Sequence, residues 1–372
     1  MFTKKLGFGL MRPPLNVPND RYDVNMDKLK LMIDTFLERD FCYFDTAYVY
    51  ANYEECIKEA LVRRHPREGY KLATKMPLSK LKTAADQERI FAEQLARTDL
   101  DYFDAYLLHD MGQENYAAAN KFDSFSFLEQ KKKDGAIRRI GFSFHDHAGL
   151  LDEILTEHPE FEFVQLQINY LDWDNKSIQS GKCYQTAQKH GKPVIVMEPV
   201  KGGILADIPE KAARLFRDFN PDMSVASWAV RYAASLDGVS GVLSGMSDME
   251  QLLDNTGYMR EFRPLSSEER AVIAEVLAII GESIAVPCTG CSYCADGCPE
   301  KIAIPNYFSL YNNVKTALPA PFYVESVYYN RLAQNHGKAS DCVGCGQCEK
   351  ACPQHIAVTQ LLKEVAKTFE IR

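Results

Sequence analysis

Short apolar runs alternate with amphipathic stretches along most of the chain. Short apolar runs are typical of buried parallel strands, whereas apolar positions spaced three and four residues apart indicate helices. The runs predict strands over residues 42–45, 70–74, 103–108, 137–142, 163–167, 193–197 and 239–243. The amphipathic stretches predict helices over residues 26–38, 53–64, 84–98, 124–133, 148–157, 181–190 and 223–234.

This alternation repeats as a strand–helix unit of roughly thirty residues. A weak eighth strand lies either near residues 6–11 or within residues 204–213. Parallel strands that are each followed by a helix predict an α/β fold, a (β/α)8 barrel of the TIM type. A doubly wound open sheet is the alternative that the same alternation allows.

The charge balance argues against a nucleic-acid-binding protein, because the formal net charge is −8 and such proteins carry a basic footprint. No apolar run approaches the roughly 20 residues that a membrane-spanning helix needs. Met1 is followed by Phe2, Thr3 and two lysines rather than by the apolar stretch of a signal peptide. We therefore expect a cytoplasmic protein that binds neither nucleic acid nor membrane.

Eight of the 11 cysteines form two copies of the pattern Cys-x-x-Cys-x-x-Cys-x-x-x-Cys-Pro. Three thiolates at this spacing can hold three corners of a 4Fe-4S cube, and the fourth, beside the proline, ligates the other cube in two-cluster ferredoxins. A zinc site would leave the third cysteine of each run and both Cys-Pro steps unexplained. Disulfides would need an oxidising compartment. We therefore predict two 4Fe-4S clusters.

Crossed ligation of this kind predicts which cysteines share a cluster. Cluster 1 would be held by Cys288, Cys291, Cys294 and Cys352. Cluster 2 would be held by Cys342, Cys345, Cys348 and Cys298. Between the two runs, residues 306–315 and 325–334 have helical patterns, so this part resembles the α-helical type of ferredoxin. The predicted domains are a barrel over residues 1–265, a linking helix over 266–283 and a cluster domain over 284–372.

Polar side chains follow three successive predicted strands. Asp45 ends the first strand with Tyr50 five residues later, Lys75 ends the second and His109 ends the third. The C-terminal ends of barrel strands meet on one face, where the active sites of such barrels lie. These four residues are therefore predicted to form one site.

In this order and spacing the four residues resemble the catalytic tetrad of the aldo-keto reductase family, and the resemblance extends over residues 6–255. It implies that Tyr50 donates a proton to a carbonyl oxygen that gains negative charge during hydride transfer. Lys75 would lower the pKa of that phenol, Asp45 would orient Lys75, and His109 would orient the carbonyl. The alternative is a buried Asp45–Lys75 pair that only holds the barrel mouth together.

The resemblance also implies a nicotinamide site, with two departures from the family pattern. Ser143 is kept, but Phe144 replaces the asparagine that follows it, and Met197 replaces an aromatic stacking partner. The basic residues that bind a 2′-phosphate in many members are replaced, which leaves NAD and NADP both open. The implied cofactor contacts are Ser143, Gln165, Met197, Lys201, Gly202, Gly203, Gly245, Ser247, Gln251 and Asn255.

A further polar cluster, residues 143–147, follows the fourth of these strands. Two interpretations are open for its histidines, His145 and His147: surface imidazoles beside a helix N-cap, or part of the site.

These features favour an iron–sulfur oxidoreductase that reduces a small carbonyl compound or oxidises an alcohol, with its clusters exchanging electrons with a partner such as a ferredoxin. Hydride carries two electrons and a cluster moves one, so coupling them normally needs a flavin or a radical intermediate, and no flavin fingerprint is visible. Three alternatives stay open: an NAD(P)H-dependent reductase with structural clusters, a ferredoxin-fed reductase without nicotinamide, and an electron carrier or redox sensor on a barrel scaffold.

Overall fold

The computed structural model describes residues 2–18, 20–282, 285–315 and 323–370. Eight parallel strands close into a barrel in sequence order, with β1 paired to both β2 and β8, so the predicted (β/α)8 barrel is confirmed. The weak eighth strand is β1, whereas residues 204–213 belong to a 3-10 turn and the start of a helix. The strands are β1 (Leu6–Gly9), β2 (Tyr43–Asp45), β3 (Lys71–Met76), β4 (Ala105–Met111), β5 (Ile140–Phe144), β6 (Phe163–Gln167), β7 (Val194–Met197) and β8 (Val239–Ser244).

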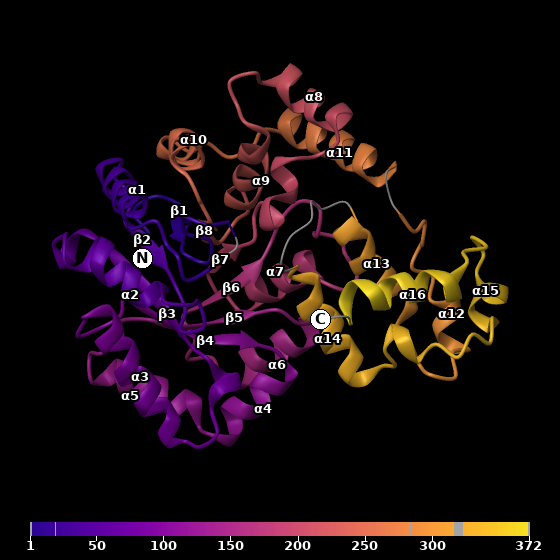
Figure 1. Cartoon of the computed structure of the whole chain (residues 1–372), viewed down its shortest axis with the longest axis horizontal. Helices are drawn as coiled ribbons and strands as arrows, with labels where there is room; N and C mark the ends of the chain where they lie inside the picture. The colour runs from indigo at the N-terminus through magenta and orange to yellow at the C-terminus, as the bar shows by residue number, and fades with distance from the viewer. Residues whose placement is uncertain (1, 19, 283–284, 316–322, 371–372) are drawn as a thin grey trace.

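Helices surround this barrel on the outside (Figure 1). Most of them bury their apolar faces against the outer sides of the strands in one continuous core. The helix predicted over residues 53–64 is split, because α2 continues as a π-helical turn over Lys58–Val62. The helices are α1 (Met26–Glu38), α2 (Tyr53–Ile57), α3 (Ala85–Thr98), α4 (Gln113–Lys121), α5 (Ser124–Lys133), α6 (Ala148–Glu157), α7 (Ser180–Lys189), α8 (Glu210–Phe219), α9 (Val225–Ala234), α10 (Met249–Arg260) and α11 (Ser267–Glu282).

Large side chains fill the interior of the barrel, including Tyr43, Leu107 and Phe163. Glycine is required where large side chains of the interior lie against a neighbouring strand. A Cβ atom at Gly141 would lie 2.6 Å from the Phe163 ring, and one at Gly241 would lie 2.2 Å from the Phe2 ring. The interior is therefore packed core rather than a channel, and reacting groups are left to the strand ends.

Helix α11, which the sequence predicts as a linker, packs on the outside of the barrel. Its Ile273, Val276 and Ile280 share a buried cluster with Phe216 of α8 and Trp228 of α9. The predicted boundary at 283/284 lies outside the described residues.

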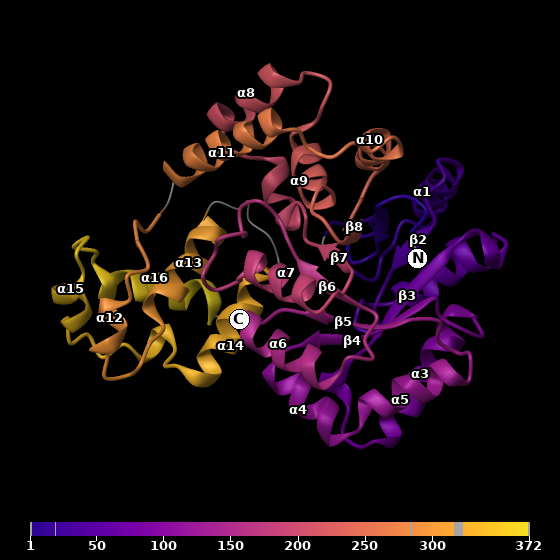
Figure 2. The same cartoon turned by 180° about the vertical axis from the view of Figure 1, so that it is seen from behind.

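The C-terminal region is helical and has an apolar core of its own, built from residues such as Tyr307, Leu310, Tyr329 and Leu362. Figures 1 and 2 show α13 and α14 between the barrel and the α12–α15 pair. Among the described residues, no helix is long and apolar enough to cross a membrane. The helices are α12 (Tyr293–Asp296), α13 (Ile304–Lys315), α14 (Glu325–Asn335), α15 (Gln347–Ala351) and α16 (Val358–Phe369).

Candidate active site and cluster-binding domain

The four residues of the predicted tetrad come together at the C-terminal ends of β2, β3 and β4. Lys75 Nζ donates to Asp45 Oδ1 at 2.5 Å and to the Thr46 carbonyl at 2.7 Å. The same Nζ lies 5.4 Å from the centre of the Tyr50 ring, which meets the His109 ring edge-on at 5.9 Å. A phenol, an imidazole and a buried ammonium therefore face one small region of the barrel mouth.

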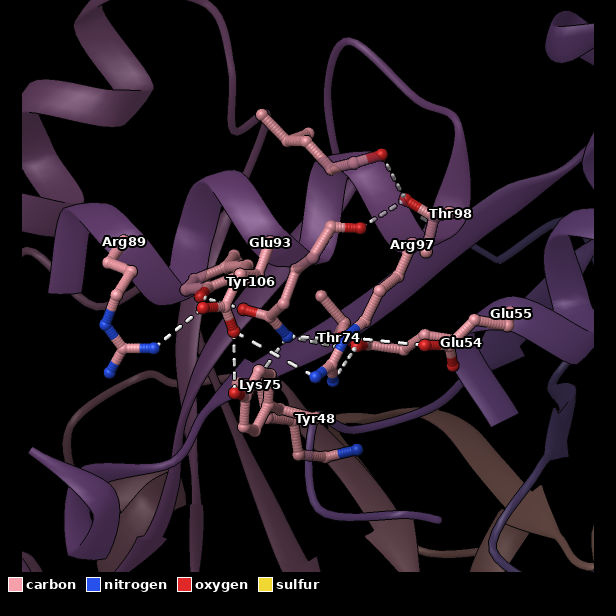
Figure 3. Close-up of polar contacts among 12 residues, drawn as sticks. Tyr48, Glu54, Glu55, Thr74, Lys75, Arg89, Glu93, Arg97, Thr98 and Tyr106 are labelled. Carbon is pink, nitrogen blue, oxygen red and sulfur yellow. Dashed lines mark hydrogen bonds and ion pairs between the residues drawn. The ribbon is translucent and has the colours of Figure 1, made fainter. Parts of the chain in front are cut away.

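A buried polar network behind β3 fixes the end of that strand (Figure 3). The Glu54 carboxylate accepts hydrogen bonds from Thr74 Oγ1 and Gln94 Nε2, both at 2.8 Å. Gln94 Nε2 also donates to the Lys75 carbonyl at 3.2 Å. The network holds the backbone of Lys75, while its side chain runs away from the network. The ammonium at its end lies next to Asp45.

The environment of Tyr50 differs from the expectation that Lys75 lowers the pKa of its phenol. Burial raises the pKa of Tyr50, and the carboxylates of Asp45, Glu198 and Asp110 raise it further, against a smaller opposite effect of Arg12. The physical reason is that Asp45 accompanies the Lys75 ammonium and offsets its field. Tyr50 is therefore held as a neutral phenol, the form that can donate a proton.

His109 is held in its neutral form as well. Burial lowers the pKa of His109 well below its usual range, and the charges of Lys75 and His145 act in the same direction. A neutral imidazole can hydrogen-bond a carbonyl oxygen without carrying a charge of its own.

A pH profile tests the assignment of Tyr50. Because its pKa is raised above 10, the phenol stays protonated up to at least about pH 10. We therefore expect carbonyl reduction to show no alkaline loss from Tyr50 ionisation between pH 7 and 10, measured as kcat under saturating reductant. An alkaline limb with an apparent pKa below 9 that disappears in a Tyr50→Phe variant would contradict it.

Three non-glycine residues with left-handed backbone directly follow residues of this site. Ala51 follows Tyr50 with a φ of 40°, Asp110 follows His109 with a φ of 59°, and Glu198 follows Met197 with a φ of 54°. Such conformations cost free energy and cluster at functional sites. Here they turn the chain sharply at the strand ends and bring two further carboxylates, Asp110 and Glu198, close enough to act on Tyr50.

The residues predicted to contact a nicotinamide lie at the ends of β5, β6 and β7. Ser143 is buried, and its Oγ accepts a hydrogen bond from the Asp110 amide at 2.9 Å. Gln165 Nε2 donates to Asp45 Oδ2 at 3.2 Å. Phe144 belongs to the core between strands and helices, and Met197 is the half-buried last residue of β7.

The residues predicted to contact phosphates lie beyond β7 and β8. Gly202 and Gly203 have φ values of 66° and 108°, which suit glycine, and they expose their backbone. A Cβ atom at Gly202 would lie 3.4 Å from Arg12 Nη2, and one at Gly245 would lie 3.9 Å from Arg12 Cβ. Two glycine-bearing turns and one guanidinium are thus brought together.

The polar side chains that follow β8 already form hydrogen bonds with other groups of the protein. The Ser247 amide donates to Gln251 Oε1 at 2.8 Å. Asn255 is buried, and its Nδ2 donates to Ser244 Oγ at 2.7 Å.

Lys201 is buried in contact with the C-terminal domain. Its Nζ lies 2.7 and 2.8 Å from the two carboxylate oxygens of Asp172 and 2.7 Å from Glu325 Oε1 of α14. All three side chains are at most 1% exposed. A phosphate would have to compete with both carboxylates for this ammonium.

Several residues at the mouth were not predicted from the sequence: Arg12, Asp110, Gln167, Tyr328 and Arg331. Arg12 and Asp110 could have been found from the sequence, because each is a charged residue at or just beyond a strand end. Asp110 also directly follows His109. Tyr328 and Arg331 could not have been found in this way, since α14 is distant in the chain from every strand.

The eight cysteines of the two runs line two separate cavities in the C-terminal domain. The first is lined by Cys288, Cys291, Cys294 and Cys352. The second is lined by Cys298, Cys342, Cys345 and Cys348. Apolar side chains such as Ile304 and Phe308 complete the first wall. The fold thus brings together the two sets that crossed ligation predicts, and four thiolates around an apolar cavity fit a 4Fe-4S cube.

Substituting the crossing cysteine tests this pairing. In Cys298→Ala we expect loss of the cluster held mainly by the later run, because Cys298 lines the cavity of Cys342, Cys345 and Cys348. The iron content should fall by about half, and the EPR signal of one reduced cluster should be lost or altered. The matched control is Cys56→Ala, which removes a buried thiol of the barrel and should leave both clusters intact. Retention of both clusters in Cys298→Ala would refute the pairing.

The fold and site define an oxidoreductase barrel joined to a cluster domain, and comparison with known proteins gives the family. The family model described as "Aldo/keto reductase family" matches residues 5–278, so the chain belongs to that family. A second model, "4Fe-4S dicluster domain", matches residues 287–357.

The individual relatives are distant. The chain is 22% identical over 277 residues to "Uncharacterized oxidoreductase YqkF" of Bacillus subtilis, covering 65% of this chain and 85% of that protein. It is 37% identical over 79 residues to an iron-sulfur subunit of the CoB--CoM heterodisulfide reductase of Methanocaldococcus jannaschii, covering 21% of this chain and only 11% of that protein. Among solved structures, it is similar to "aldo-keto reductase AKR11C1 from Bacillus halodurans (holo form)", with 25% identity, a TM-score of 0.58, and coverage of 73% of this chain and 91% of the other.

Proposed function

We propose that this protein reduces the carbonyl group of a small molecule, or oxidises the corresponding alcohol, with Tyr50 as the group that donates or accepts the proton. The observation that supports this most directly is the assembly of Tyr50 with His109 and the buried Lys75–Asp45 pair at the barrel mouth. An ion pair that only held the mouth together would need neither the phenol nor the imidazole beside it. A neutral phenol next to a neutral imidazole can hold a carbonyl oxygen and protonate it as negative charge develops.

The same mouth offers residues that could hold NAD(P). The exposed backbone of Gly202 and Gly203 and the nearby Arg12 guanidinium suit the phosphates, since backbone amides and a cation stabilise anionic oxygens. Ser143 and Gln165, which lie on β5 and β6, are the residues that we propose for the carboxamide. A bound nicotinamide would supply or take the hydride. One solved structure of the same fold is an "aldo-keto reductase from Klebsiella pneumoniae in complex with NADPH".

The two cysteine-lined cavities are proposed to hold 4Fe-4S clusters in the crossed pairing. Bound clusters would supply single-electron transfer, and a redox partner such as a ferredoxin is the expected exchange partner.

An anaerobic titration of the cluster-loaded protein tests this proposal. NADH and NADPH are added separately while cluster absorbance and nucleotide fluorescence are followed, and 4-nitrobenzaldehyde is then supplied as a carbonyl probe. We expect at least one nucleotide to bind and to support turnover of the probe. If neither nucleotide binds and turnover occurs only with dithionite-reduced protein, the reductase is fed by its clusters rather than by nicotinamide. If no reductant supports turnover of any carbonyl, the protein is an electron carrier or sensor and the proposal fails.

A further inference from the structure

Helix α14 of the cluster domain contributes two side chains to the barrel mouth. Tyr328 donates from its hydroxyl to Gln167 Oε1 at 3.3 Å, and its ring meets the His145 ring edge-on at 6.0 Å. One turn later, Arg331 Nη2 lies 2.6 Å from Asp110 Oδ1 and 3.2 Å from the Asp110 carbonyl. The cluster domain therefore closes the mouth directly beside His109 and Tyr50.

The Arg331 side chain is mostly buried and packs against the barrel. Its side chain is 14% exposed and rests on the backbone of Gly112, where a Cβ atom would lie 2.6 Å from the Arg331 Cζ. Any residue other than glycine at that position would displace the guanidinium. The arginine is thus held in one place by the start of α4 and by Asp110.

Two nitrogen atoms at this place lack a partner. Among the described residues, neither Arg331 Nη1 nor His145 Nδ1 has a hydrogen-bond partner, although both atoms are buried. A buried polar group without a partner is unfavourable, so a ligand that satisfies it gains free energy. Each of the two open interpretations fits one histidine, because the His145 imidazole faces this region while His147 is the exposed N-cap of α6.

The unpartnered pair adjoins the reacting groups. Arg331 pairs with Asp110, the residue that follows His109, and Tyr328, one turn earlier on α14, meets the His145 ring, so these side chains gather at the same strand ends. Other cations of the mouth already have carboxylate partners, such as Lys75 with Asp45 and Arg12 with Glu198. Arg331 has a carboxylate on one nitrogen only, which leaves Nη1 as a cationic donor without a partner.

We propose that Arg331 and His145 bind a carboxylate of the substrate next to its reacting carbonyl, so that the substrate class is an oxo acid and its hydroxy acid. This deepens the proposed function and rests on it. One carboxylate oxygen takes Arg331 Nη1, a charge-assisted hydrogen bond, and the other faces His145 Nδ1. The anion itself favours the protonated, donating form of that imidazole. Arg331 and Tyr328 then make the cluster domain part of the substrate-binding site.

Binding measurements on the anaerobic, cluster-loaded protein test this inference. Calorimetry with phenylglyoxylate and with its methyl ester compares an acid with a neutral molecule of nearly the same shape, and pyruvate with methyl pyruvate repeats the comparison with a smaller probe. We expect the acid of at least one pair to bind tenfold or more tightly than its ester. Equal binding of acid and ester in both pairs, or binding of none of the four, would overturn the inference.

Two substitutions predict effects of opposite sign. Arg331→Gln should weaken binding of the acid tenfold or more relative to the ester, and Arg331→Lys should restore part of that loss because it keeps the charge. Asp110→Asn should strengthen binding of the acid, because it removes the negative charge that competes with the substrate carboxylate for the guanidinium, and asparagine tolerates the left-handed backbone of this position. An Arg331→Gln change that weakens acid and ester equally would contradict a carboxylate contact.

The matched control is Asn335→Ala. It removes another hydrogen bond from α14 to the barrel, from Asn335 Nδ2 to Gln113 Oε1 at 3.1 Å, one turn beyond Arg331. It should leave the acid-to-ester ratio unchanged; a shift as large as that of Arg331→Gln would mean that the docking of α14, not a contact with the anion, sets the ratio. If acids bind more tightly than esters but no reductant supports turnover, the carboxylate contact is supported and the proposed carbonyl chemistry is refuted. If acids and esters are turned over at equal kcat/KM, the carbonyl chemistry is supported and the carboxylate contact is refuted.

Discussion

Replacing Tyr50 with phenylalanine is expected to lower kcat for carbonyl reduction by about 100- to 10,000-fold, the usual contribution of a positioned general acid. The ring and its contact with His109 are kept, so the loss reports the missing proton rather than altered packing. Substrate and nucleotide binding should change little, because the hydroxyl acts mainly as charge develops in the transition state. Turnover of 4-nitrobenzaldehyde under single-turnover conditions measures the effect.

Tyr48→Phe provides the control for this prediction. Tyr48 lies two residues earlier, but its hydroxyl donates to Glu93 Oε2 at 2.7 Å on the outer side of the barrel wall (Figure 3). The same chemical change there should leave kcat within about threefold, since a partly exposed hydrogen bond away from the site contributes little. Undiminished turnover in Tyr50→Phe would refute the assignment of the acid.

Replacing Lys201 with methionine is expected to destabilise the protein by about 3–5 kcal/mol, because it leaves two buried carboxylates without their cation. Asp172 and Glu325 are at most 1% exposed, so water cannot take the place of the ammonium. Because Glu325 lies on α14, the loss should appear as early separation of the cluster domain from the barrel. Thermal unfolding followed by cluster absorbance and by far-UV circular dichroism measures both events.

Two further variants make this result specific. Lys176→Met removes an exposed contact between the domains, from Lys176 Nζ to the Gly290 carbonyl at 2.8 Å, and should cost less than about 1 kcal/mol. Adding Asp172→Asn and Glu325→Gln to Lys201→Met removes the uncompensated charges and should recover part of the stability. If Lys201→Met is no less stable than Lys176→Met, the buried triad does not hold the domains together.

The strand and helix of each repeat could be predicted from the sequence because their apolar positions follow a local periodicity. Apolar runs and amphipathic stretches predicted seven strands and several helices to within a few residues, and helices α1, α5 and α6 begin and end where predicted. Asp45, Tyr50, Lys75 and His109 could be grouped because the ends of parallel strands meet on one face of a barrel. The cysteine runs carry their own spacing, so the prediction of a dicluster domain needed no knowledge of the fold.

The weak strand β1 shows where local pattern was insufficient. Residues 6–9 contain two glycines, which lowers their apolar signal, yet the first of these glycines is required by side chains of the neighbouring strands. A Cβ atom at Gly7 would lie 2.7 Å from Leu243, a residue far away in the chain. Glycine is needed at position 7 because closure of the barrel brings β8 against β1.

By itself, the sequence determined the barrel, the dicluster domain and the four residues of the tetrad, because each depends on periodicity or spacing along the chain. Only the tertiary structure decided the electrostatics of the site and what covers it. The pKa of Tyr50 is raised rather than lowered, because burial and the carboxylates of Asp45, Glu198 and Asp110 act on it from the ends of separate strands. Arg331 of α14 reaches Asp110 across 221 positions of the chain, a distance at which no local pattern carries information.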